Sequence, residues 1–240
     1  TYFVLGNHDH YGGRIADVRE TARRGQTDTL RWLPDAGVVA LSETVGLVGV
    51  GGWGDARLGR FLDDPLLLND YIAIADLRTA GLPDAAAWRD VDPMTGWKNR
   101  AALQARLQAL GTEAAATLQP SLEAALATHE HVVVLVHVPP FHEVSWHRGR
   151  PSREEGLPGF VCKAVGDLLL EVADRHPDRD LLVLSGHTHH AAEARLRPNL
   201  LARTAPATYG EPDFQFVALP WAEGRPGASR EQSGGFSQEA

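Results

Sequence analysis

Histidines follow three apolar runs in this sequence. The runs, each with the residues after it, are residues 2–5 before Gly-Asn-His-Asp-His at 6–10, residues 132–136 before His137, and residues 181–184 before Ser-Gly-His-Thr-His-His at 185–190. Neutral imidazole is the commonest metal ligand in proteins. Extended backbone would direct His187 and His189, two positions apart, the same way. A metal centre is therefore one interpretation, and a solvated histidine-rich turn is the other.

The apolar runs themselves predict the strands that would position these side chains. They are continuous and rich in Val and Leu, which is typical of parallel strands covered by helices on both faces. Open α/β sheets place their functional residues at the carboxyl edge of such strands. We therefore expect an α/β fold in which the residues after the three runs meet at one edge.

The remaining segments supply helices and further strands. We predict helices over residues 14–24, 71–78, 103–126 (bent or broken at Pro120) and 157–175, with another helix ending at 30–33. We predict strands at residues 38–41, 45–50, 191–196, 200–205 and 214–219, the last three antiparallel. Residues 56–96 are interpreted as an irregular insertion over the site. Residues 141–159 form a long loop, and loops of that length usually serve function.

Composition excludes several classes of protein. The 240 residues have a hydrophobic fraction of 43% and a formal net charge of -8, which argues against nonspecific nucleic-acid binding. Cys162 is the only cysteine, so neither a disulfide framework nor a thiolate metal site is expected. No apolar run has the length of a membrane helix, and we predict a cytoplasmic protein. The composition of residues 222–240 predicts a disordered tail, and the oligomeric state is left open.

The order of the three motifs resembles that of the calcineurin-like metallophosphoesterases. The matching residues are Gly-Asn-His-Asp at 6–9, the strand that ends in His137, and Gly-His-Thr-His at 186–189. The resemblance runs from residue 1 to about 220. It implies a four-layer α/β/β/α sandwich of two mixed sheets flanked by helices, in one domain of residues 1–221.

The resemblance also implies roles for individual residues. Asn7, His137 and His187 would be ligands of the second of two divalent metal ions, and His189 a ligand of the first. His8 would lie beside the leaving group, oriented by Asp9. His10, His142 and His190 have no fixed role in the family. We assign His10 and His142 to substrate contact, with a surface or structural role as the alternative.

The implied activity is hydrolysis of a small phosphomonoester or phosphodiester by a metal-bridging hydroxide. Two metals about 3.5 to 4 Å apart can hold a phosphoryl group and activate a bridging water. His, Asn and carboxylate ligands suit Mn, Fe or Zn. Two alternatives stay open: a His-cluster zinc hydrolase that acts on amides or esters, and a noncatalytic or inactive form of the fold.

The sequence departs from the family at its beginning. The family has an Asp-x-His strand and a Gly-Asp strand before the Gly-Asn-His-Asp motif, and neither occurs before residue 6. The chain begins at Thr1, inside a predicted core strand. We therefore expect an amino-terminally truncated domain that, on its own, binds metal weakly and has little activity.

Overall fold

A six-stranded mixed sheet forms the centre of the fold in the computed structural model, which describes residues 1–63, 66, 68–81, 100–211, 214–219 and 221. The strand order is β3-β4-β5-β8-β10-β9. The four inner strands are parallel, and the edge strands β3 and β9 are antiparallel to their neighbours. The bounds are β3 (Val39–Ala40), β4 (Val45–Val50), β5 (His131–Val136), β8 (Asp180–Ser185), β9 (Ala192–Arg197) and β10 (Leu200–Thr204).

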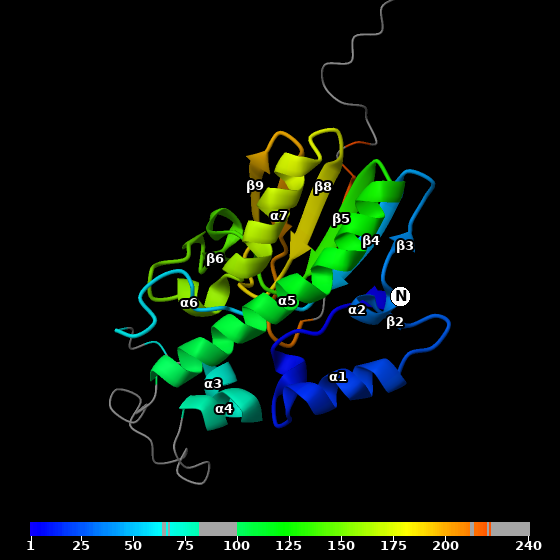
Figure 1. Ribbon diagram of the computed structural model, residues 1–240. Helices are drawn as coiled ribbons and strands as arrows, with labels where there is room; N and C mark the ends of the chain where they lie inside the picture. The colour runs from blue at the N-terminus through cyan, green and yellow to red at the C-terminus, as the bar shows by residue number, and fades with distance from the viewer. Residues whose placement is uncertain (64–65, 67, 82–99, 212–213, 220, 222–240) are drawn as a thin grey trace, which may run out of the picture.

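Two helices, α5 (Arg100–Thr128) and α7 (Lys163–Arg175), lie side by side on one face of this sheet (Figure 1). Their apolar residues recur at helical spacing, so each helix turns one stripe toward the strands. Leu118 and Leu122 of α5 and Leu169 of α7 are fully buried in the main core. Burying each such side chain typically contributes about 1.5–3 kcal/mol. This packing fixes the inner strands, and with them the turns at their carboxyl ends.

The amino-terminal segment packs against β4. Its strands β1 (Tyr2–Phe3) and β2 (Arg31–Trp32) pair in parallel as a small sheet. Gly49 of β4 permits the close approach, because a Cβ there would lie 2.7 Å from Leu33 Cδ1 and 3.1 Å from Val4 Cγ1. The other elements here are η1 (His8–His10), α1 (Ile15–Arg24) and α2 (Leu33–Ala36).

The described part of the insertion forms two short helices, α3 (Asn69–Ala73) and α4 (Ala75–Gly81). They pack on the first half of α5 in a second apolar cluster that contains Tyr71, Ile74, Leu77, Leu103 and Leu107. The segment after β5 contains η3 (His142–Val144), β6 (Trp146–His147), β7 (Arg150–Pro151) and α6 (Leu157–Phe160). The predicted irregular loop therefore has local structure of its own.

The structure confirms a mixed α/β fold and most of the predicted elements, with four corrections. Residues 30–33 do not end a helix, because Arg31–Trp32 pairs with β1. Residues 214–219 form no strand, and Phe214 and Phe216 are exposed. The helix at Pro120 is not broken: it continues as α5, held by the buried residues on either side of the proline. The helix predicted over 157–175 is divided into α6 and α7.

Two further expectations concern the ends of the chain. Residues 2–5 are not a central strand of the large sheet, because only Tyr2–Phe3 is a strand and it belongs to the small sheet. The tail predicted at 222–240 lies outside the described residues. Within the described residues, no helix combines the length and apolar character needed to cross a membrane.

Candidate metal centre

Two of the predicted ligands follow neighbouring parallel strands. His137 comes directly after β5, and His187 comes two residues after β8. The Gly186 N–H donates a hydrogen bond to the His137 carbonyl at 3.0 Å, and the His137 N–H donates to the Gly51 carbonyl at 2.7 Å. The carboxyl ends of β4, β5 and β8 are thus tied together by backbone, which places both imidazoles at one edge of the sheet.

Asn7 joins these two histidines from the amino-terminal segment. Its Oδ1 lies 2.8 Å from His137 Nε2 and 3.3 Å from His187 Nδ1, and the two ring nitrogens are 3.2 Å apart. A circle through these three atoms has a radius of about 1.8 Å, less than the roughly 2.0–2.1 Å of a metal–nitrogen bond. One metal ion can therefore reach all three donor atoms, and the residues fit the ion that the sequence implies.

The tautomer of His187 is fixed by a backbone carbonyl. His187 Nε2 lies 3.0 Å from the Gly159 carbonyl oxygen, which can only accept, so Nε2 carries the proton. Nδ1 then presents its lone pair to Asn7 and His137. Metal-binding histidines almost always donate their other ring N–H to a carbonyl, a carboxylate or water. The His187 ring is thus already held in the orientation and tautomer that a ligand requires.

Burial favours the neutral form of these imidazoles. It lowers the pKa of His137 to about 3, with a further contribution from repulsion by His187. It also lowers the pKa of His187, against the opposing effect of the Asp70 carboxylate. Metal ions bind imidazole only in its unprotonated form. Both rings are therefore neutral near neutral pH, which is the charge state that metal binding requires.

Asp70 was not predicted from the sequence, yet it contacts the site directly. It lies on α3 and is 7% exposed. Asp70 Oδ1 accepts hydrogen bonds from Asn7 Nδ2 at 2.7 Å and from the Tyr11 hydroxyl at 2.6 Å. Burial and this bond raise the pKa of Tyr11. No spacing in the sequence relates Asp70 to Asn7, 63 positions away, so only the fold reveals the contact.

The rings of His8 and His189 both contact the ring of Tyr209. The His8 ring stacks on Tyr209 at 5.7 Å between centroids, and the His189 ring meets Tyr209 edge-on at 4.6 Å. His8 also lies 4.6 Å from the Tyr11 ring. Tyr209 is 72% exposed and was not predicted from the sequence. Burial and repulsion by His8 lower the pKa of His189.

The backbone at His187 and His189 differs from the prediction. Both residues have positive φ, 68° and 60°, so the extended backbone that was to direct them the same way is absent. Histidine adopts this left-handed region more often than most residues. Such backbone strain is concentrated at functional sites, where the surroundings must hold it in place. Here His187 is held by Gly159 and His189 by Tyr209.

The role of Asp9 in orienting His8 stays a prediction. Its Oδ2 accepts a hydrogen bond from the Gly6 N–H at 2.7 Å, and within the described residues none joins it to the His8 ring. Asp9 therefore closes the turn that carries Asn7.

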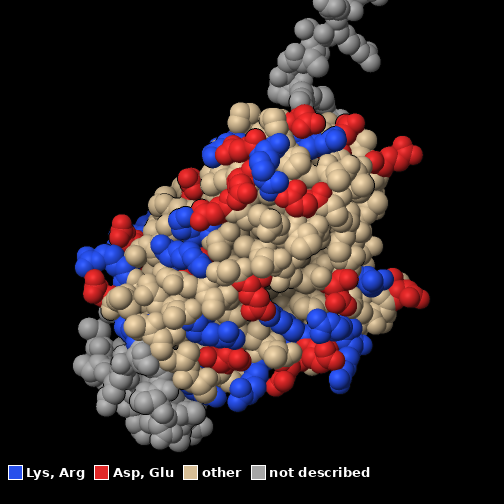
Figure 2. All heavy atoms as spheres, in the orientation of Figure 1, with Lys and Arg blue, Asp and Glu red and all other residues tan. Residues whose placement is uncertain are grey.

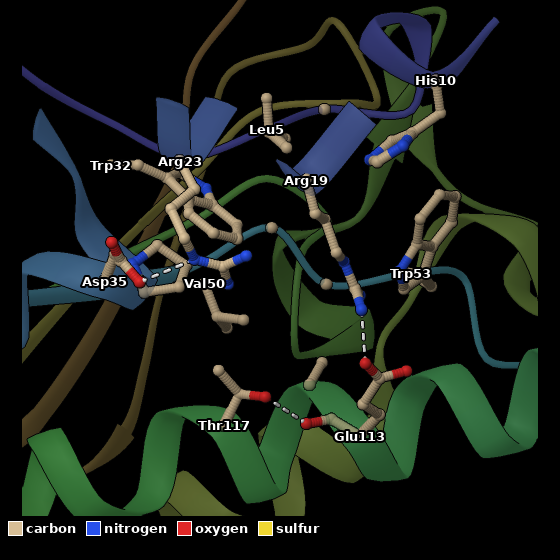
Figure 3. A pocket seen from close by; sticks show the side chains of 15 residues that line it. Leu5, His10, Arg19, Arg23, Trp32, Asp35, Val50, Trp53, Glu113 and Thr117 are labelled. Atoms are coloured by element: carbon tan, nitrogen blue, oxygen red, sulfur yellow. Dashed lines mark hydrogen bonds and ion pairs between the residues drawn. The ribbon is translucent and has the colours of Figure 1, made fainter. Parts of the chain in front are cut away.

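His10 faces a separate cavity of about 200 Å³ between α1 and α5 (Figure 3). It is 3% exposed and lies near Trp53 and Arg19, and its Nδ1 has no hydrogen-bond partner among the residues that the structure describes. Burial and the Arg19 guanidinium lower its pKa to about 4. Its proposed contact with substrate stays a prediction.

Two further histidines, His142 and His147, belong to the segment after β5, and His190 follows β8. His142 is exposed, and its Nε2 lies 3.2 Å from the Ser152 carbonyl, which it helps to hold. His190 stacks on Trp146 at 6.2 Å. His147, which no prediction singled out, has its Nδ1 3.4 Å from the Thr188 carbonyl. Substrate contact by His142 likewise stays a prediction.

The donor set is unusual in one respect. Among the described residues, no three His, Cys, Asp or Glu side chains are arranged to hold a metal ion. The third donor in this cluster is the amide oxygen of Asn7. His189 is not one of the three donor residues, and its ring meets that of Tyr209. Cys162 is fully buried with its pKa raised to about 12, so it is neither a ligand nor a nucleophile.

Comparisons with models of protein families, with curated protein sequences and with solved structures found no match. The interpretation of this centre therefore depends on the geometry of its own side chains.

Proposed function

We propose that the chain is a metal-dependent phosphoesterase domain that acts on a small phosphomonoester or phosphodiester. The observation that carries the proposal is the triangle of Asn7 Oδ1, His137 Nε2 and His187 Nδ1, with sides of 2.8–3.3 Å. Two imidazoles and a neutral amide suit Mn, Fe or Zn better than Ca or Mg. Divalent ions bound there would hold a phosphoryl group and lower the pKa of a water molecule toward about 7.

The residues of the chain divide into three roles in this proposal. Asn7, His137 and His187 form one metal position, and His189 contributes to a second. His8 is exposed beside this cluster, where its ring can donate a proton to the oxygen of the leaving group. General acids of this kind typically contribute 10²–10⁴-fold to the rate.

The proposal also covers the fold, the partners and the location. The four-layer sandwich is supported by the contacts of Val4 and Leu33, which directly follow β1 and β2, with β4 at Gly49. One face of the large sheet is covered by α5 and α7 (Figure 1). Lysine, arginine and acidic side chains are interspersed on the face drawn in Figure 2. With the net charge of -8, this favours a small phosphate ester over nucleic acid. We place the protein in the cytoplasm, since its only cysteine is buried and unpaired.

Metal titration combined with a substrate panel tests the function. The chain would be titrated with Zn²⁺ and Mn²⁺ by calorimetry, then assayed with p-nitrophenyl phosphate, bis(p-nitrophenyl) phosphate and p-nitrophenyl acetate. We expect metal binding and a preference for the phosphate esters. Metal binding with turnover of acetate alone would favour the zinc hydrolase alternative. Absence of metal binding would refute the proposed function.

The expectation of low activity in the chain alone remains a prediction. One three-donor position and His189 supply fewer ligands than two metal ions need. Turnover should therefore be low even when the Asn7 position is loaded. Efficient hydrolysis by the 240-residue chain would contradict this expectation while supporting the proposed function.

A further inference from the structure

The hydrogen bond between Asn7 and Asp70 determines which way the Asn7 amide is oriented. Its carboxylate can only accept hydrogen bonds, so the group that faces it at 2.7 Å must be the Nδ2 of Asn7. The Oδ1 of the same amide is then directed at His137 and His187. A flipped amide would set its oxygen against the carboxylate and its N–H groups against the ring nitrogens.

We propose that Asp70 is a positioning residue that holds Asn7 Oδ1 toward the metal position. The inference rests on the proposed function, and it adds a residue of the insertion to the site. Hydrogen bonds to a carboxylate are about twice as strong as those between neutral groups. Asp70 is also mostly buried, which reduces competition from water.

Tyr11 fixes the carboxylate in turn. Its hydroxyl donates to the same oxygen, Asp70 Oδ1, at 2.6 Å. Tyr11 lies four positions after Asn7, so both donors come from one turn of the chain. Two donors on one oxygen restrict the rotation of the Asp70 carboxylate. Because the Asn7 amide is hydrogen-bonded to that carboxylate, its rotation is restricted as well.

Other contacts hold the insertion in place without Asp70. The Gly12 N–H donates to the Ala73 carbonyl at 2.8 Å, and the Ala75 N–H donates to the Gly13 carbonyl at 3.0 Å. The Asp76 carboxylate accepts from the Ile15 N–H at 2.9 Å. Loss of the Asp70 side chain therefore leaves α3 and α4 attached, and a positioning role can be separated from a structural one.

Asp76 provides the matched control. Like Asp70, it is a carboxylate of the insertion that accepts a hydrogen bond from the amino-terminal segment, but it touches no donor atom of the metal position. Asp70→Ala and Asp76→Ala each remove such a bond. Asp70→Asn keeps an oxygen that can accept from Asn7 and Tyr11, so it serves as the conservative variant.

The test measures Zn²⁺ affinity by competition with a chromogenic chelator, with the Co²⁺ absorption spectrum as a second readout. Residues that hydrogen-bond to a metal ligand without binding the metal themselves typically contribute 10- to 100-fold to metal affinity. We expect Asp70→Ala to weaken Zn²⁺ binding by that factor and to alter the Co²⁺ spectrum. Asp76→Ala should leave both near wild type, and Asp70→Asn should be closer to wild type than to Asp70→Ala.

A double variant tests whether Asp70 acts through Asn7. Asp70→Ala should add no further loss in an Asn7→Ala background, because the amide that it positions is gone. Equal Zn²⁺ affinity of wild type and Asp70→Ala would overturn the inference alone, as would equal losses from Asp70→Ala and Asp76→Ala. A wild-type chain that binds no Zn²⁺ would overturn the proposed function and this role with it.

Discussion

His187 donates its Nε2–H to the carbonyl of Gly159 at 3.0 Å. Gly159 lies in α6, at the far end of the segment that follows β5. That segment therefore sets the tautomer of a residue that follows a different strand, β8.

Replacing His187 or His137 with Ala should abolish most metal binding. Each change removes one of only three donor atoms. The loss of metal affinity should therefore exceed the roughly 10- to 100-fold that is typical when a residue hydrogen-bonded to a metal ligand is removed. His129→Ala is the matched control, because His129 precedes β5, at the opposite end of that strand from His137, and its Nδ1 lies within hydrogen-bond distance of Ala125 and Thr128. Zn²⁺ affinity measured by chelator competition checks this. Equal affinities of the three variants would contradict the assignment.

Gly6→Ala should weaken metal binding by displacing an imidazole. A Cβ at Gly6 would lie 2.8 Å from His137 Cε1 and 3.0 Å from its Nδ1, so the ring must move. Overpacking of this kind typically costs about 1–3 kcal/mol. Gly186→Ala is the control, because a Cβ there meets nothing within 4 Å. Calorimetric titration with Zn²⁺ should separate the two, and unchanged affinity of Gly6→Ala would show that the His137 ring is free to shift.

His8→Ala should lower kcat with little change in metal content. The ring lies outside the three-donor group and against Tyr11 and Tyr209. In a form of the protein with measurable turnover, the loss should approach 10²–10⁴-fold for poor leaving groups. It should be smaller for nitrophenyl esters, which leave without a proton. Steady-state rates with phenyl and p-nitrophenyl phosphates test this, and equal losses for both would argue against proton donation.

His10 should make the fold less stable in mild acid. Burial and Arg19 lower its pKa to about 4, with Asp9 and Asp76 opposing. Above the unfolded pKa of about 6.5 the residue is neutral in both states. As the pH falls toward 4, only the unfolded state gains a proton, so the free energy of unfolding decreases. At pH 5 the difference between the folded and unfolded pKa values of His10 lowers the free energy of unfolding by about 2 kcal/mol.

The His10→Phe variant isolates that contribution. Phe keeps a ring against Trp53 and cannot titrate. Urea unfolding at pH 7 and pH 5, with a chelator present, should show a smaller decrease in stability for the variant than for wild type. The same decrease in both proteins would assign the acid sensitivity to other groups, such as His137 and His187.

Most strands of the large sheet could be predicted because each is marked by an apolar pattern within its own sequence. The apolar runs before His137 and His187 are continuous, and β5 and β8 are indeed parallel neighbours. The antiparallel pair of β9 and β10 was predicted for the same reason. In contrast, Arg31–Trp32 becomes a strand only by pairing with Tyr2–Phe3, about 29 positions away, and nothing in its own sequence reveals that partner.

The candidate site could be predicted in composition but not in geometry. The resemblance of the three motifs to a known family implied Asn7, His137 and His187, and the structure brings these three side chains together. The left-handed backbone at His187 depends on neighbours that fold around it. Asp70 was missed because a single aspartate within an irregular segment carries no pattern. Its role depends on one contact across 63 positions.

The three donor atoms lie 50 to 180 positions apart in the chain. A metal ion bound to them would therefore cross-link the amino-terminal segment to two inner strands of the large sheet, much as a disulfide joins distant parts of a secreted domain. An ion that binds only the folded state leaves the unfolded chain unconstrained, and it adds to stability by mass action. The ion proposed to bind the phosphoryl group would therefore also stabilise the fold, by linking the segment that follows β1 to the large sheet.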